Sequence, residues 1–243
     1  MAVDLHKFAN PARFLRISDA IFPWVSGLAV ILLAIGLYMA LFVSPRDYQQ
    51  GDTVRIMFVH VPAAWMSMSI YVMMAVASAV GLIWKHPVAD LSAKASAPIG
   101  ACFTFLALVT GALWGQPMWG TYWVWDARLT SMLILFFLYL GYMALWSSFD
   151  DQSKAAKAAA ILVLVGVINI PIIKFSVDWW NTLHQPASVA TMEGPKIHSS
   201  ILTPLLIMGV AYLALFASVF IIRVKSEILS RRLRMLQINR LQE

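Results

Sequence analysis

Six long runs without a charged residue determine what this chain can fold into. They cover residues 21–43, about 56–84, 95–114, 129–149, 158–173 and 201–222. A helix needs about 20 apolar residues to cross a bilayer, whereas a membrane β-strand needs about ten with alternating polarity. The pattern predicts an all-α integral membrane protein with six transmembrane helices in one domain, residues 1–243. The fifth run is short and contains Asn169 and Pro171, so we expect a kink there.

The composition agrees with a chain that lies in lipid. Of its 243 residues 60% are hydrophobic and 12% are charged, against about 25% charged residues in a soluble domain, which excludes a soluble enzyme. The net charge of +6 comes from basic residues beside the apolar runs, so it favours membrane lipid over nucleic acid as the partner. Cys102 is the only cysteine, which excludes an intrachain disulfide and a CxxCH haem attachment site, and we expect it to be buried.

The positions of the basic residues predict the orientation. With six spans both termini lie on one side, and 13 of the 18 Lys and Arg residues flank that side. The positive-inside rule then places both termini in the cytoplasm, with the basic tail 223–243 expected along the inner membrane surface. The thirteen are Lys7, Arg13, Arg16, Lys85, Lys94, Lys154, Lys157, Arg223, Lys225, Arg231, Arg232, Arg234 and Arg240.

The external connection between the third and fourth spans is rich in tryptophan. Residues 114–128 read WGQPMWGTYWVWDAR and hold Trp114, Trp119, Trp123 and Trp125, four of the ten tryptophans. An aromatic belt explains one or two tryptophans at a span end, but not four among two glycines and a proline. We expect a tightly turned loop that presents indole rings to a flat ligand such as a sugar, a quinone or haem.

Two external histidines narrow the choice of ligand. His60 lies at the outer end of the second span, and His184 follows a Trp-Trp pair in the last external segment. Two imidazoles from separate segments are a typical axial ligand pair for haem iron. The alternative is that His60 bonds a backbone carbonyl and His184 is an ordinary loop residue. His198 has no aromatic neighbours and is expected to have no role at the site.

Charged residues beside these groups suit the propionates of haem. Arg55 precedes His60 and Arg128 ends the tryptophan segment, so both are candidate propionate partners. The alternative for each is that it caps a span and reaches to lipid headgroups. Asp126 is expected to shape the loop, by pairing with Arg128 or by accepting an indole N–H.

The run from Trp119 to Asp126 matches the pattern W-G-x-x-W-x-W-D. On this motif, with six spans and one external histidine on either side, the whole chain resembles the CcmC branch of the WWD family of haem-handling proteins in cytochrome c maturation. The resemblance implies a bacterial inner-membrane protein, not an enzyme, that holds non-covalent haem b at its periplasmic face and delivers it to the haem chaperone CcmE. It implies His60 and His184 as axial ligands, and the motif tryptophans with Asp126 as haem platform and partner contacts. The ABC transporter subunits CcmA and CcmB and the small membrane protein CcmD are further implied partners, and the chain itself has no Walker A motif.

Two other classes stay open on the residues alone. A transmembrane b-type cytochrome in electron transfer carries paired histidines deep within its spans, and this chain has none there. A membrane permease subunit has interrupted helices and ionisable residues near the bilayer midplane. Only Asn169 and Pro171 point in that direction.

Overall fold

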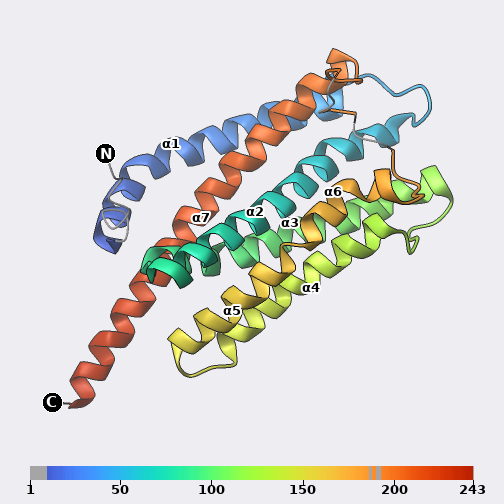
Figure 1. Ribbon diagram of the computed structural model, residues 1–243. Coiled ribbons are helices and arrows are strands. Elements are labelled where there is room, and N and C mark those ends of the chain that lie inside the picture. Colours follow the sequence, from blue (N-terminus) through green and yellow to red (C-terminus); the bar gives the residue numbers. More distant parts are fainter. Residues whose placement is uncertain (1–9, 186–187, 190–192, 243) are drawn as a thin grey trace.

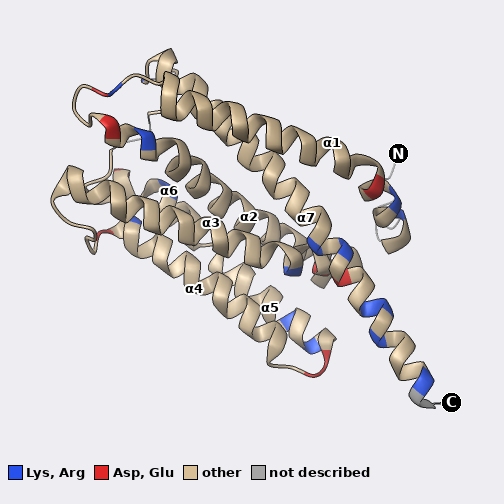
Figure 2. Ribbon diagram, turned by 180° about the vertical axis from the view of Figure 1, so that it is seen from behind, with Lys and Arg blue, Asp and Glu red and all other residues tan. Residues whose placement is uncertain are grey.

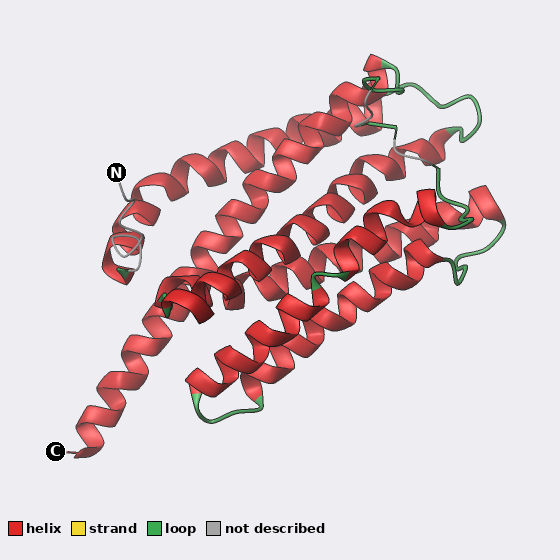
Figure 3. Cartoon of the chain, viewed as in Figure 1, coloured by secondary structure: helices red, strands yellow, loops and turns green. Residues whose placement is uncertain are grey.

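The computed structural model describes residues 10–185, 188–189 and 193–242, and this part of the chain is helical apart from short connections (Figures 1 and 3). A π-helical turn η2 follows the first helix, and a 3-10 turn η3 precedes the second. The elements are α1 (Pro11–Tyr38), η2 (Met39–Val43), η3 (Asp52–Ile56), α2 (Met57–Trp84), α3 (Pro87–Trp119), α4 (Ala127–Ser147), α5 (Gln152–Gly166), α6 (Asn169–Trp179) and α7 (Ser199–Gln242).

The expected six spans are confirmed as helical stretches long and apolar enough to cross a membrane. Most of them begin or end beyond the uncharged runs, because polar residues cap the helices outside the apolar part; Asn10, for example, caps α1 by accepting the backbone N–H of Ala12 at 2.9 Å. The spans are Pro11–Val43, Asp52–Trp84, Pro87–Trp119, Ala127–Ser147, Gln152–Trp179 and Ser199–Arg240.

The fifth span is interrupted where the sequence predicted a kink. Helix α5 ends at Gly166 and α6 begins at Asn169, and at this break the backbone N–H groups of Ile168 and Ile170 bond carbonyls three residues back instead of four. The buried Asn169 side chain donates to the carbonyl of Ser131 on α4 at 2.8 Å. The break therefore lies against a neighbouring helix, where irregular backbone is tolerated in a membrane.

The helices form three groups that lie side by side (Figures 1 and 2). Helix α1 packs along α7, α2 and α3 form the centre, and α4 packs against α3, α5 and α6. Tyr71 and Tyr139 are fully buried in this core, with their rings edge to face at 5.2 Å, and the Tyr139 hydroxyl donates to the Ser67 carbonyl at 2.7 Å.

Cys102 is exposed on α3, so the expectation that it is buried is wrong.

Both ends of the described chain lie at one end of the bundle, which we call the terminal end; the other is the loop end. Figure 2 shows most Lys and Arg at the terminal end. There Lys94 of α3 pairs with Glu227 of α7 at 2.8 Å and lies over the Trp146 ring, 4.9 Å from its centroid. The segment 223–242 continues α7 without a break and projects past the bundle (Figure 1). Its expected position along the inner membrane surface stays a prediction.

The crossing of α3 with α4 leaves no room for a side chain at Gly100. A Cβ there would lie 2.3 Å from Tyr139 ring atoms, whereas a Cβ at Gly27 on α1 would meet nothing within 4 Å. We expect Gly100→Ala to lower the free energy of unfolding by about 1–3 kcal/mol, the usual cost of overpacking. Thermal unfolding in detergent measures this, and Gly27→Ala is the matched control, which should keep or raise the midpoint. Equal midpoints for the two variants would contradict the packing described here.

Candidate functional site

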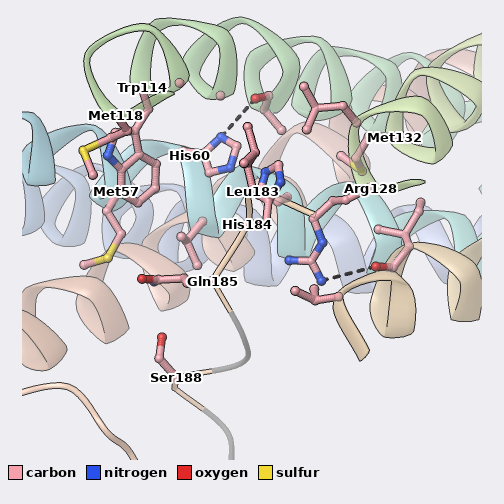
Figure 4. A pocket seen from close by; sticks show the side chains of 18 of the residues that line it. Met57, His60, Trp114, Met118, Arg128, Met132, Leu183, His184, Gln185 and Ser188 are labelled. Atoms are coloured by element: carbon pink, nitrogen blue, oxygen red, sulfur yellow. Dashed lines mark hydrogen bonds between the residues drawn. The ribbon is translucent and has the colours of Figure 1, made fainter. Parts of the chain in front are cut away.

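A cavity of about 450 Å³ lies at the loop end of the bundle, within the usual size range of cofactor sites. Its walls come from α2, α3, α4, α6 and α7, and from the connecting residues Gln49, Gln50, Trp123, Leu183, His184, Gln185, Ser188, Val189 and Ile197. Figure 4 shows His60 and His184 pointing into this space from different segments, with Trp114 and Met118 on one side and Arg128 on the other. Segments far apart in the sequence thus build one site.

His60 occupies the first turn of α2 and is held by α3. Its Nδ1 lies 3.0 Å from the carbonyl oxygen of Ala107 and 3.1 Å from Oγ1 of Thr110. A carbonyl only accepts, so Nδ1 carries the proton and Nε2 of the neutral ring keeps its lone pair. Gly111 allows the close approach, since a Cβ there would lie 2.9 Å from Cε1 of His60. The carbonyl bond expected under the alternative is present, and it leaves Nε2 free as a ligand.

His184 lies in the connection between α6 and α7 and pairs with Asp126. Its Nδ1 is 3.4 Å from Oδ2 of Asp126, while Oδ1 of Asp126 accepts the Leu129 backbone N–H at 2.7 Å and caps α4. Asp126 therefore pairs with a histidine, and not with Arg128 or an indole as expected from the sequence. A carboxylate on Nδ1 leaves Nε2 as the ligand atom, as in carboxylate–histidine–metal arrangements.

Burial lowers the pKa of His184 below its usual value of 6.5, and the Asp126 carboxylate acts in the opposite direction. Arg128 also lowers this pKa, because its positive charge disfavours a second one nearby. The imidazole is therefore neutral at pH 7 and available as a ligand.

Three of the four tryptophans of the segment 114–128 line the cavity. The Trp114 ring lies edge-on to His60 with centroids 5.7 Å apart, and the Trp119 ring lies similarly against His184 at 4.9 Å. Trp123 is the third, whereas Trp125 is 74% exposed and does not line the cavity. Each histidine therefore has its own indole neighbour.

The backbone of the tryptophan segment differs from the expected tight loop. Residues 114–119 are the last turns of α3, which Gly120 ends with a φ of +76°. Gly115 serves close packing, since a Cβ there would lie 2.9 Å from the Trp119 ring. The expectation of a turned backbone is wrong for this half of the motif and holds only for the short connection between Gly120 and Asp126. A glycine just past a helix end is the signal that was available in the sequence.

The two predicted arginines lie in different places. Arg128 lines the cavity and ties α4 to α6: its Nε donates to Oγ of Ser176 at 3.2 Å, and its Nη2 donates to the carbonyls of Ile173 and Lys174 at 3.3 Å. Its Nη1 takes no part in these bonds. Arg55 lies in η3, pairs with Asp52 at 3.4 Å and does not line the cavity. His198 bonds Ser200 at the start of α7 and is not among the residues that line the cavity.

Sequence reasoning missed several residues of the site. Lys174 and Asp178 of α6 line the cavity, as does Gln50, whose Oε1 accepts the Trp114 indole N–H at 3.0 Å. Gln50 stands in no motif, and only the tertiary structure brings it to the tryptophan. Lys174 lies three residues after Pro171, and the kink expected there was the sequence signal that could have drawn attention to it.

Comparison with known proteins decides the family. Residues 4–239 match the family CcmC, heme exporter protein C. This chain belongs to that family. It is 61% identical over 235 residues to heme exporter protein C of Bradyrhizobium diazoefficiens, covering 97% of this chain and 89% of that protein. It is 50% identical to the protein of the same name in Haemophilus influenzae and 49% identical to that of Escherichia coli, each over 225 residues, 93% of this chain and 92% or 91% of theirs.

We expect Asp126→Asn to lower the pKa of His184 further. The change removes the negative charge that favours the imidazolium, yet asparagine is as good a helix cap, so α4 is retained. Titration of the imidazole by NMR in the haem-free protein measures this pKa. Asp178→Asn is the control, since that cavity carboxylate is not among the groups acting on His184, and it should leave the midpoint in place. A higher midpoint in Asp126→Asn would contradict the pairing.

Proposed function

We propose that this protein binds haem b non-covalently through His60 and His184 and delivers it to the haem chaperone CcmE in cytochrome c maturation. The observation that carries the proposal is that both imidazoles line one cavity with Nδ1 engaged, while Nε2 has no hydrogen bond within the described residues. Among the described residues no group of three or more His, Cys, Asp and Glu side chains is suited to a metal ion. Two imidazoles alone suit an iron whose other four ligands belong to a porphyrin.

The walls of the cavity support a flat, mostly apolar cargo. Trp114, Trp119 and Trp123 contribute large apolar rings, and Met57 and Met132 add polarisable side chains that adapt to an irregular outline. Such a wall suits a conjugated macrocycle better than a sugar, which needs many more hydrogen-bond partners than these side chains offer.

Cations at the rim support the recognition of two carboxylates. Arg128 has Nη1 left for the cavity, and Lys174 lies on the neighbouring wall. In this proposal they pair with the propionates of haem. Arg55 pairs with Asp52 and does not line the cavity. In this proposal it therefore attracts the propionates only as a charge at a distance and does not bond them directly.

Location and partners follow from the family and from charge. In this proposal the protein is a multi-pass protein of the bacterial inner membrane, with the basic terminal end in the cytoplasm and the cavity facing the periplasm. The relatives carry the name heme exporter protein C, which supports association with the ABC transporter subunits CcmA and CcmB and with CcmD. In this role the protein is a haem-handling subunit and not an enzyme.

The two alternative classes have less support. A b-type cytochrome in electron transfer has its histidines deep in the bundle, whereas His60 lies in the first turn of α2 and His184 outside the spans. For a permease subunit, the interrupted fifth span is the favourable feature. Its buried Asn169 is used to bind the Ser131 carbonyl, so this polar group serves packing.

The residues divide into those that hold haem and those that face a partner. The cavity holds the two imidazoles and three indoles, whereas the Trp125 ring lies outside on the surface of the same connection. Delivery requires that one imidazole leaves the iron as an acceptor ligand approaches. An exposed aromatic residue beside the cavity is a suitable contact for that acceptor.

We expect His60→Ala and His184→Ala each to convert low-spin haem to a high-spin or haem-free form. Loss of either imidazole removes one axial ligand, and the affinity for haem should fall at least about tenfold. The visible spectrum and haem content of the detergent-purified variants measure this. His198→Ala is the control and should retain the wild-type spectrum. A wild type that stays haem-free when haem is supplied would falsify the proposal.

We expect Trp125→Ala to slow transfer of haem to the purified haem chaperone while the haem content stays at the wild-type level. Trp125 does not line the cavity, so it contributes to partner contact and not to retention. Stopped-flow transfer from the loaded protein measures the rate. Tyr48→Ala is the matched control, because Tyr48 is 90% exposed and belongs to the connection between η2 and η3, which lies at the same end of the bundle. Equal loss of transfer in both variants, or loss of haem in Trp125→Ala, would contradict this division.

A further inference from the structure

The first connection at the loop end, between η2 and α2, holds one side of the cavity in place through Gln50. Oε1 of Gln50 accepts the indole N–H of Trp114 at 3.0 Å, across 64 residues of sequence. Trp114 in turn lies edge-on to His60, with ring centroids 5.7 Å apart. A continuous line of contacts therefore joins this connection to a proposed iron ligand.

Gln50 itself is fixed by a short hydrogen-bonded turn. Oδ1 of Asp47 accepts the backbone N–H of Gln50 at 2.8 Å, and the Thr53 hydroxyl donates to the Gln50 carbonyl at 2.7 Å. The backbones of Asp47 and Gly51 pair at 2.9 and 3.2 Å, and Gly51 takes a φ of +58° that closes the turn. Both backbone groups of Gln50 are thus satisfied locally, and its side chain is left to meet the tryptophan.

The hydrogen bonds of His60 within the described residues all lie at one edge of its ring, so the ring plane depends on packing contacts. The bonds of Nδ1 to Ala107 and Thr110 fix one edge of the imidazole, and Gly111 lies against Cε1. A ring held at one edge can still tilt about that hydrogen bond. The Trp114 ring limits the tilt of the imidazole on the cavity side. It can do so only while the hydrogen bond to Gln50 holds the plane of the indole.

We infer that Gln50 is a positioning residue: it holds the Trp114 indole, and through it the plane of the His60 imidazole that binds the iron. The inference rests on the haem-binding function proposed above and adds a residue that touches neither the iron nor His60. The orientation of an axial imidazole affects the electronic structure of low-spin ferric haem, so it has a spectroscopic signature of its own.

The test compares variants of the full-length protein in detergent, each supplied with haemin. Gln50→Leu keeps the approximate volume but removes the acceptor, and Gln50→Glu keeps an acceptor oxygen. Gln116→Leu is the matched control, because it makes the same substitution at an exposed residue of α3 that does not line the cavity and whose side chain has no hydrogen bond within the described residues. Trp114→Phe removes the same hydrogen bond from its donor side, because phenylalanine has no indole N–H.

We expect Gln50→Leu to lose haem to apomyoglobin about three- to tenfold faster than the wild type, the factor expected for one lost hydrogen bond. Its low-spin ferric EPR signal should broaden, because the imidazole plane is less well defined. Gln50→Glu should restore both properties, Gln116→Leu should match the wild type, and Gln50→Leu in the Trp114→Phe background should add nothing.

The outcomes separate this inference from the proposed function. A wild type that binds haem while Gln50→Leu behaves like Gln116→Leu overturns the role of Gln50 and leaves haem binding intact. Additive effects of Gln50→Leu and Trp114→Phe also overturn it, because the two residues then act independently. A haem-free wild type overturns both proposals together. If Gln50→Leu does not fold, Gln50→Glu and Trp114→Phe still give the comparison.

Discussion

The arrangement of this protein depends on the requirement that every backbone N–H and C=O within the membrane finds a partner inside the protein. The spans meet it as helices, so irregular backbone is concentrated at the two ends of the bundle. The interruption after Gly166 obeys the same rule, because it lies against α4 and Asn169 bonds a carbonyl there. Residues with functional geometry are thus displaced to the loop end, where turns and helix caps are allowed.

At that end, the packing of α2 on α3 sets the chemistry of the site. Ala107 lies within α3, and its carbonyl determines which nitrogen of His60 carries the proton. A sliding of one helix by a turn would exchange that carbonyl for another group and would move Gly111 from the imidazole. The helix contact that buries apolar surface is therefore the same contact that decides which nitrogen of His60 keeps its lone pair.

The six spans could be predicted from the sequence because uncharged runs of about 20 residues have few other structures available to them. The motif also indicated the right region, and the two histidines and three of the four tryptophans meet in one cavity. The pairings could not be predicted, because Asp126 meets His184 58 residues away and Trp114 meets Gln50 64 residues away. Only the role of Asp126 as the N-cap of α4 could be predicted from neighbouring sequence, because an aspartate before an apolar helical run is a typical helix start.

The two histidines are held unequally, and this has a consequence for hand-over under the proposed function. His60 is part of a helix and is bonded at 3.0 Å to another, whereas His184 lies in a connection and pairs with Asp126 at 3.4 Å. Displacing an imidazole costs less where fewer neighbours must move with it. Exchange with an incoming ligand is therefore easier on the His184 side, which is also the side of Asp126 and of the exposed Trp125. A firm ligand on one face and a displaceable one on the other allows a carrier to retain its cargo without preventing its release.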